Sequence, residues 1–207
     1  ARRGVRRALF ALALSVLASD LRAQRVEARL GALISTTLVE DLGANAALQL
    51  NLPADYASPV KIKLAPAPVA SVGLVQDLSP RVSLELMGSV AVSKLRAHSR
   101  AARWDMQDVS LAALSAAVRY AYRPRVNLHG GIGVTRFITE SASIFSEGID
   151  SEPLLELGVS TSIPAGALPI RGAVRMQAHT FGTPALQRAG ASNGRVLRLL
   201  IQAGIGG

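Results

Sequence analysis

The sequence predicts an all-β protein, an eight-stranded antiparallel up-and-down transmembrane β-barrel that follows an N-terminal signal peptide. The first observation is the segment from Arg81 to Lys94, RVSLELMGSVAVSK, in which apolar and polar residues alternate. This period of two lasts about a dozen residues, roughly twice an ordinary soluble strand, and exceeds the about 9 to 11 residues that a tilted strand needs to cross a bilayer. The second observation is that apolar and polar residues alternate in seven further segments. The third is that the connections between the segments are alternately long and short.

The amino-acid composition excludes several classes of protein. The chain of 207 residues contains no cysteine, which excludes a disulfide framework and a thiolate metal site. The hydrophobic fraction is 49%, yet after Ser19 no stretch approaches the roughly 20 apolar residues of a membrane-spanning helix. A membrane-embedded form of this chain must therefore be a closed barrel, because lipid cannot satisfy open sheet edges. We predict one barrel domain over residues 25–207.

The N-terminal segment is predicted to be a signal peptide over residues 1–24. Four arginines precede the apolar run 8–18, and the small residue Ala23 offers a cleavage position, which is the layout of an export signal. A short amphipathic anchor helix is the alternative. Five of the 23 basic residues lie in this segment, so the basic balance is partly a targeting feature and we expect no nucleic-acid partner.

The first two strands are predicted over residues 25–36 and 60–76. In the first, apolar residues alternate with Glu27, Arg29, Gly31 and Ser35, and in the second Val60, Ile62 and Leu64 alternate with Lys61 and Lys63. Pro66 and Pro68 interrupt the second strand. Because proline cannot donate to a ladder, we expect a bulge or a local break there.

The third strand is Arg81 to Lys94, and the fourth covers residues 108–122. The segment SLAALSAAVRYAY would also tolerate a helix, but the separation of Leu114 and Val118 from Ser115 and Arg119 favours a strand. The remaining strands begin near Val126, Leu155, Ile170 and Leu197, each with its apolar residues on one face.

The connections between these strands alternate in length. They are long at 38–59, 95–107, 140–151 and 182–193, and short at 77–80, 123–125 and 164–169. Short turns on the periplasmic side and long loops on the other are typical of outer-membrane barrels. Residues 25–207 resemble the family of small eight-stranded outer-membrane barrels, the OmpA/OmpX or OmpW-like type. The resemblance implies a monomer in the cell outer membrane with a structural or surface-interaction role, and outer-membrane lipids, lipopolysaccharide and the barrel-insertion machinery as partners.

The polar face distinguishes a membrane barrel from a soluble one. It is mostly glycine, serine and alanine with a few charges, which suits the narrow interior of eight strands. Buried charges must pair, so we predict an interior polar network of Glu27, Arg29, Glu85, Arg119, Glu156, Arg171, Arg175 and Arg198. Any solute pathway would then be narrow. In the alternative, a soluble exported lipocalin-like barrel that binds an apolar ligand, the apolar face would point inward.

Catalytic, metal and cofactor sites find little support in the sequence. Gly130-Gly131-x-Gly133 lies within a predicted strand and no helix follows, so a dinucleotide loop is not expected. His98, His129 and His179 show no ligand spacing. A lipid-modifying barrel enzyme is the second alternative, with His179 and Thr180 as candidates and Ser192 and Glu152 as partners. We expect no enzyme, no metal and no cofactor.

The long loops differ in charge. Loop 95–107 and its flank carry Lys94, Arg96, Arg100 and Arg103, whereas Glu140, Glu147, Asp150 and Glu152 lie in and beside loop 140–151. Arginine binds phosphate through paired donors, so the basic set is predicted to contact lipopolysaccharide. Attraction between the two loops is the simpler explanation.

Overall fold

The computed structural model describes residues 24–52, 59–100, 102–139, 144, 149–165, 169–191 and 194–206. The predicted signal peptide lies outside these residues except for Gln24, which begins the first strand. The described elements, in chain order, are β1 (Gln24–Ser35), β2 (Thr37–Leu42), α2 (Ala44–Gln49), β3 (Val60–Leu64), β4 (Ala67–Asp77), β5 (Val82–His98), β6 (Arg103–Arg123), β7 (Val126–Ile138), β8 (Ile149–Ile163), β9 (Ile170–Phe181), α3 (Pro184–Arg188) and β10 (Gly194–Gly206).

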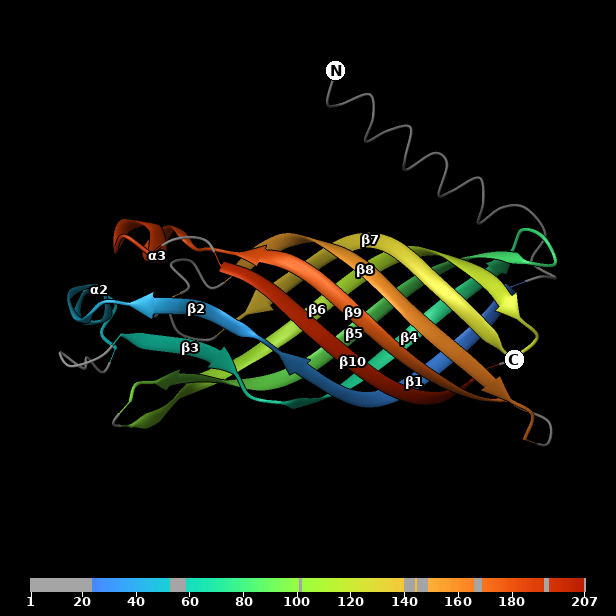
Figure 1. Ribbon diagram of the computed structural model, residues 1–207, viewed down its shortest axis with the longest axis horizontal. Helices are drawn as coiled ribbons and strands as arrows, with labels where there is room; N and C mark the ends of the chain where they lie inside the picture. The colour runs from blue at the N-terminus through green and yellow to red at the C-terminus, as the bar shows by residue number, and fades with distance from the viewer. Residues whose placement is uncertain are drawn as a thin grey trace, which may run out of the picture.

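Eight of the strands close into a ring. The antiparallel order β5-β4-β1-β10-β9-β8-β7-β6 is completed by pairing of β5 with β6, so the ring has no open edge. β2 and β3 pair with each other beyond the ring, and β3 also pairs with the far part of β5. Figure 1 shows this extension at the end that carries α2 and α3. We call that end the loop end, and the opposite end, with the short connections, the turn end.

The apolar faces of the ring point outward. Leu30, Val90, Ile132 and Leu155 are between 61% and 71% exposed, whereas Glu85 on the opposite face is fully buried. An apolar outer wall around a charged interior is the arrangement of a transmembrane barrel. The predicted fold class and inside-outside assignment are therefore confirmed, and a lipocalin-like barrel with its apolar face inward does not fit.

A second apolar region fills the interior at the loop end. Its members come from both the ring and the extension, and they include Leu38, Ile62, Leu95, Phe137, Phe181 and Leu186, each no more than 1% exposed. Polar side chains are buried there too, since Arg198, Thr135 and His179 lie close to Phe137 or to one another. The segments that were predicted to be loops supply many of the apolar side chains of this region.

Three of the four predicted long loops are wrong in extent, and the fourth contains a helix. β5 continues to His98 and β6 starts at Arg103, so only 99–102 connect them instead of 95–107. Past the end of the apolar outer wall, the side chains of β5 still alternate between inside and outside: Leu95 and Ala97 are buried, while Arg96 and His98 face outward. The predicted loop 38–59 likewise includes most of β2 and all of α2, β8 begins within the predicted loop 140–151, and the predicted loop 182–193 contains α3. The helix alternative for residues 108–122 is excluded by β6.

The predicted break near the prolines divides one expected strand into two. β3 ends at Leu64 and β4 begins at Ala67, and Ser93 Oγ donates to the Ala65 carbonyl at 2.6 Å between them. Val60, Ile62 and Leu64 are buried, so their apolar face points inward, opposite to that of the ring strands. The two pieces pair with different halves of β5.

Thr36 joins the extension to the ring wall. Its amide donates to the Leu197 carbonyl at 2.9 Å, and its Oγ1 accepts from the Leu197 amide at 3.0 Å. In the described part of the chain, no helix has the length and apolar character needed to span a membrane.

Glycine at position 131 permits a close approach of β7 to β6. A Cβ there would lie 2.4 Å from the Ala116 carbonyl oxygen and 2.7 Å from the Ala117 Cα, whereas a Cβ at Gly130 would meet only a Leu157 methyl at 3.7 Å. The two adjacent glycines are thus a matched pair, one crowded by backbone and one not.

We expect Gly131→Ala to lower the free energy of unfolding by about 1–3 kcal/mol, the usual cost of overpacking. Gly130→Ala is expected to change it little, because its new methyl group makes only an ordinary contact. Urea titration of both variants in detergent compares them. A loss from Gly130→Ala as large as that from Gly131→Ala would contradict the close approach.

Candidate functional site

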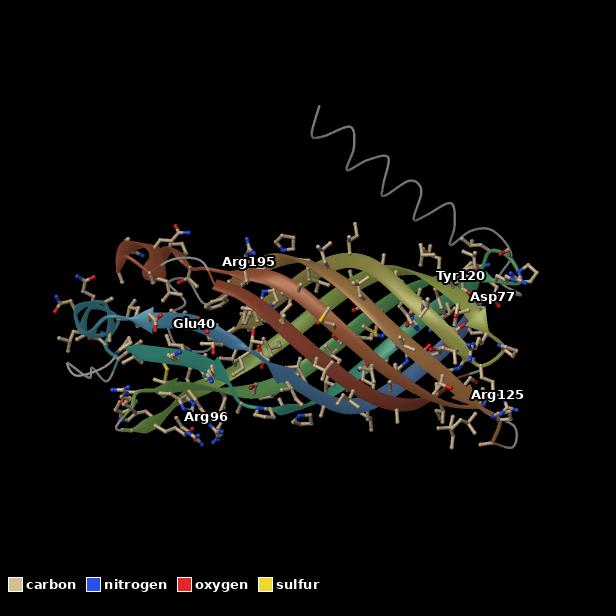
Figure 2. All side chains as sticks on the ribbon, viewed as in Figure 1. Glu40, Asp77, Arg96, Tyr120, Arg125 and Arg195 are labelled. Carbon is tan, nitrogen blue, oxygen red and sulfur yellow. The ribbon has the colours of Figure 1, made fainter. Side chains whose placement is uncertain are left out.

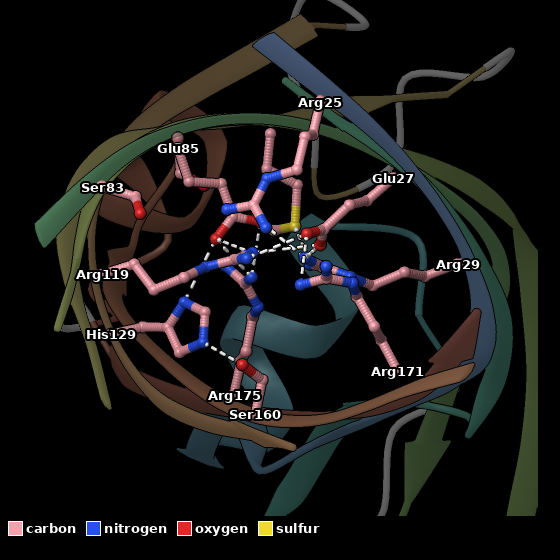
Figure 3. A network of polar contacts seen from close by, with 12 residues as sticks. Arg25, Glu27, Arg29, Ser83, Glu85, Arg119, His129, Ser160, Arg171 and Arg175 are labelled. Carbon is pink, nitrogen blue, oxygen red and sulfur yellow. Dashed lines mark hydrogen bonds and ion pairs between the residues drawn. The ribbon is translucent and has the colours of Figure 1, made fainter. Parts of the chain in front are cut away.

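Glu85 on β5 lies at the centre of a buried ion-pair network. Its carboxylate oxygens accept from Arg29 at 2.8 Å, Arg119 at 3.1 Å and Arg175 at 2.7 Å. His129 Nδ1 lies 3.1 Å from Glu85 Oε2, and its Nε2 lies 2.7 Å from Ser160 Oγ. Figure 3 shows these side chains converging from facing walls of the barrel.

Two further carboxylates extend the network. Glu27 accepts from Arg119 at 2.8 Å and from Arg171 at 2.9 Å, and it also contacts Arg29. Glu156 accepts from Arg175 at 2.5 Å and from Gln177 at 2.8 Å. Three carboxylates thus face four guanidinium groups, from β1, β5, β6, β8 and β9.

The network is almost entirely buried. Its carboxylates and the side chains of Arg29, Arg119 and Arg175 are at most 3% exposed, and Arg171 is 12% exposed. Desolvation makes a buried charge costly unless it is paired and hydrogen-bonded. The network therefore fixes the strands around it and occupies the turn-end half of the lumen, while the apolar region occupies the other half.

The structure brings together seven of the eight predicted network residues. Arg198 lies apart, where its Nη1 donates to Thr135 Oγ1 at 2.8 Å and its guanidinium carbon sits 4.9 Å from the centre of the Phe137 ring. The predicted network did not include His129. Its position opposite Gly158 and Arg119 in the strand register was the only signal, and it required knowledge of the pairing.

The candidate enzyme residues do not assemble a nucleophile and a base. His179 points inward and Thr180 outward, and His179 Nδ1 lies 2.7 Å from the Thr180 carbonyl oxygen. Thr180 Oγ1 donates to Glu152 at 3.1 Å instead. Ser192 lies outside the described residues. Within the described part, no group of three or more histidine, aspartate or glutamate side chains could hold a metal ion.

Basic side chains gather on the outward face of the extension. We call this set the cationic ladder, and it consists of Lys61, Lys63, Lys94, Arg96, His98 and Arg103. Lys61 pairs in register with His98, which pairs with Arg103, while Lys63 pairs with Arg96. Partial burial, followed by the positive charges of Arg103, Lys63 and Arg96, lowers the pKa of His98. The ladder thus gathers five lysine and arginine cations around His98, which is itself neutral near pH 7.

Three of the four residues predicted to contact lipopolysaccharide belong to the ladder. Arg100 lies at the hairpin tip, and Arg96 makes an ion pair with Asp105 at 2.7 Å. Lys61 and Lys63 were missed, because their strand was expected to carry its apolar face to the lipid. Glu140 and Glu147 of the acidic loop lie outside the described residues, as does the side chain of Asp150.

No protein-family model and no curated protein matches the chain. Among solved structures, the outer membrane protein OprG from Pseudomonas aeruginosa is similar at a TM-score of 0.49 and 9% identity, over 89% of this chain and 95% of that chain. The attachment invasion locus protein Ail of Yersinia pestis is similar at a TM-score of 0.42 and 11% identity, over 88% and 98%.

The barrel's own geometry determines its environment. A closed antiparallel ring satisfies its backbone internally, its outer wall is apolar and its interior is charged, which is the architecture that outer-membrane proteins use to cross lipid. The chain is therefore an outer-membrane β-barrel, in agreement with the sequence prediction.

Proposed function

We propose that this barrel has a surface-interaction role and that the cationic ladder binds the phosphate groups of lipopolysaccharide. The observation that carries the proposal is the row of cations directly beyond the lipid-facing belt. Val92 is 60% exposed on the outer wall of β5, and the next outward residues on that strand are Lys94, Arg96 and His98. These positions lie where the headgroups of the outer leaflet begin.

The charges of the ladder are arranged for an external anion. Like charges directly opposite each other on neighbouring strands are destabilising, yet Lys63 pairs with Arg96. Lys61 and Arg103 lie on either side of His98. Asp105 and Asp108 lie on the neighbouring part of β6, where Asp105 pairs with Arg96 and Asp108 lies opposite Lys94 in register. The cations of the ladder with no acidic residue directly opposite are therefore Lys61, Lys63 and Arg103. Phosphates bridging the strands would relieve this repulsion through charge-assisted hydrogen bonds, which are about twice as strong as neutral ones.

The triple variant Lys61→Gln, Lys63→Gln and Arg103→Gln tests the proposal. We expect retention of lipopolysaccharide by the immobilised protein in detergent to fall about tenfold or more, since each lost charge-assisted hydrogen bond contributes about 1.5–3 kcal/mol. A matched triple, Arg136→Gln, Arg188→Gln and Arg195→Gln, removes the same charge from exposed positions that belong neither to the ladder nor to the turn end. Unchanged retention by the ladder variant, or an equal loss from the matched triple, would contradict the proposal.

A further inference from the structure

A second basic site lies at the other end of the barrel, in the mouth beside the short turns. The structure contains there a cavity of about 550 Å³, which we call the mouth pocket. Five arginines line it, namely Arg25, Arg81, Arg119, Arg125 and Arg171. Ser79, Ser83, Asn127 and Ser162 add further polar groups. Figure 2 shows Asp77 and Arg125 at this end, opposite Arg96.

The acidic groups near the mouth pocket already have partners. Asp77 is the acidic residue of the lining, and its Oδ1 accepts from Arg25 at 2.7 Å and from Ser83 Oγ at 2.6 Å. Glu27 behind the pocket is shared by Arg119 and Arg171. Arg81 and Arg125 are exposed, and their guanidinium groups make no ion pair among the described residues. The pocket therefore carries an excess of positive charge.

Three of these arginines also have donors without acceptors. The Nε atoms of Arg25, Arg119 and Arg171 are buried and have no hydrogen-bond partner in the described part of the chain. Arg119 is only 3% exposed, so water does not compensate freely for the missing acceptor. Buried donors that remain unpaired are costly. The Nε atoms of Arg29, Arg175 and Arg198 are unpaired as well, but those of Arg25, Arg119 and Arg171 belong to residues that line an open cavity, which an acceptor with negative charge can enter.

The mouth pocket opens to water rather than to lipid. Ser83 and Arg119 form the deep wall and lie on the inward face of the barrel, whereas the neighbouring Tyr120 is 42% exposed on the outer face. A lipid headgroup outside the wall would meet Tyr120 and not these side chains. An anion that reaches them comes through the mouth, which faces the periplasm when the short turns do.

We propose that the mouth pocket binds a small, water-soluble oxyanion of the phosphate class on the periplasmic side. Guanidinium forks match the geometry of phosphate oxygens and supply paired donors. The exposed Arg81 and Arg125 close over the anion from the rim, while Arg119 and Arg171 hold it from inside. This site is independent of the lipopolysaccharide contact proposed for the cationic ladder, because the two share no residue and lie at opposite ends.

Calorimetric titration with inorganic phosphate tests the site on the full chain in a non-ionic detergent at low salt. We expect saturable binding with one site per chain. Arg81→Gln combined with Arg125→Gln is expected to weaken it by about tenfold or more, because charge-assisted hydrogen bonds are lost. Both side chains are exposed, so the folded barrel is expected to survive, and heat-modifiable gel mobility verifies this.

Arg123→Gln is the matched control. Arg123 lies in the same turn region but stacks over the outward Tyr122 ring at 5.4 Å and does not line the pocket, so phosphate binding should persist. Absence of saturable binding by the wild-type protein, or equal weakening by Arg123→Gln, would overturn the proposal. Tighter binding of a soluble short-chain phosphatidic acid than of phosphate would assign the site to a lipid headgroup and overturn the soluble ligand.

Discussion

Replacing Glu85 by alanine is expected to lower the free energy of unfolding of the barrel by about 3–5 kcal/mol, the typical cost of breaking a buried ion pair. The carboxylate is fully buried and accepts from Arg29, Arg119 and Arg175. Its removal leaves these three guanidinium groups with only Glu27 and Glu156 to share. The uncompensated positive charge, rather than the lost packing, accounts for most of the effect.

Glu40→Ala is the control for this loss. Glu40 is exposed on β2, where a carboxylate keeps its hydration and an ion pair contributes at most about 1 kcal/mol. Urea titration of both variants in detergent, followed by heat-modifiable mobility, compares the midpoints at constant slope. If the two substitutions lowered stability equally, Glu85 would have to face solvent, and the inside-outside assignment would be reversed.

Phe137→Ala is expected to lower the free energy of unfolding by about 3–5 kcal/mol, as buried phenylalanine truncations do. The ring is fully buried in the apolar region at the loop end. Its centre lies 5.0 Å from that of Phe181 and 5.8 Å from that of His179, and the Arg198 guanidinium lies over it. The truncation therefore leaves a cavity and removes an aromatic partner from a buried cation.

The adjacent Ile138 provides the comparison for Phe137. Ile138 is 42% exposed on the outer face, so in Ile138→Ala the lost contacts are largely with detergent or lipid. The same titration should show a loss well below that of Phe137→Ala. A larger loss at Ile138 than at Phe137 would mean that the apolar residues of β7 pack outside the barrel rather than in its lumen.

The alternation of side chains was sufficient to predict which face of each ring strand points inward. Glu85 and Arg119 were both assigned to the inward face on adjacent predicted strands, and they lie 3.1 Å apart. The contact between Glu27 and Arg171 depends on closure of the ring and on register across it. Neither quantity can be read from a period of two, so only the structure could supply that contact.

The loop-end extension could not be predicted for a different physical reason. β3 is only five residues long, and its lysines alternate with apolar residues. A strand that crosses lipid shows the same alternation, with its apolar residues facing the lipid and its polar residues facing the lumen. Which face is inward depends on whether the strand lies in lipid or beyond it. The same uncertainty hid Lys61 and Lys63 from the predicted basic surface, and it left the apolar region around Phe137 unassigned.

Fractionation of cells that express the full chain is the measurement that tests the membrane assignment most directly. The outward apolar belt predicts that the protein is recovered in the outer-membrane fraction, is extracted only with detergent, and migrates differently on a gel before and after heating because the closed barrel resists unfolding. Recovery of the protein in the soluble fraction without detergent would contradict the account.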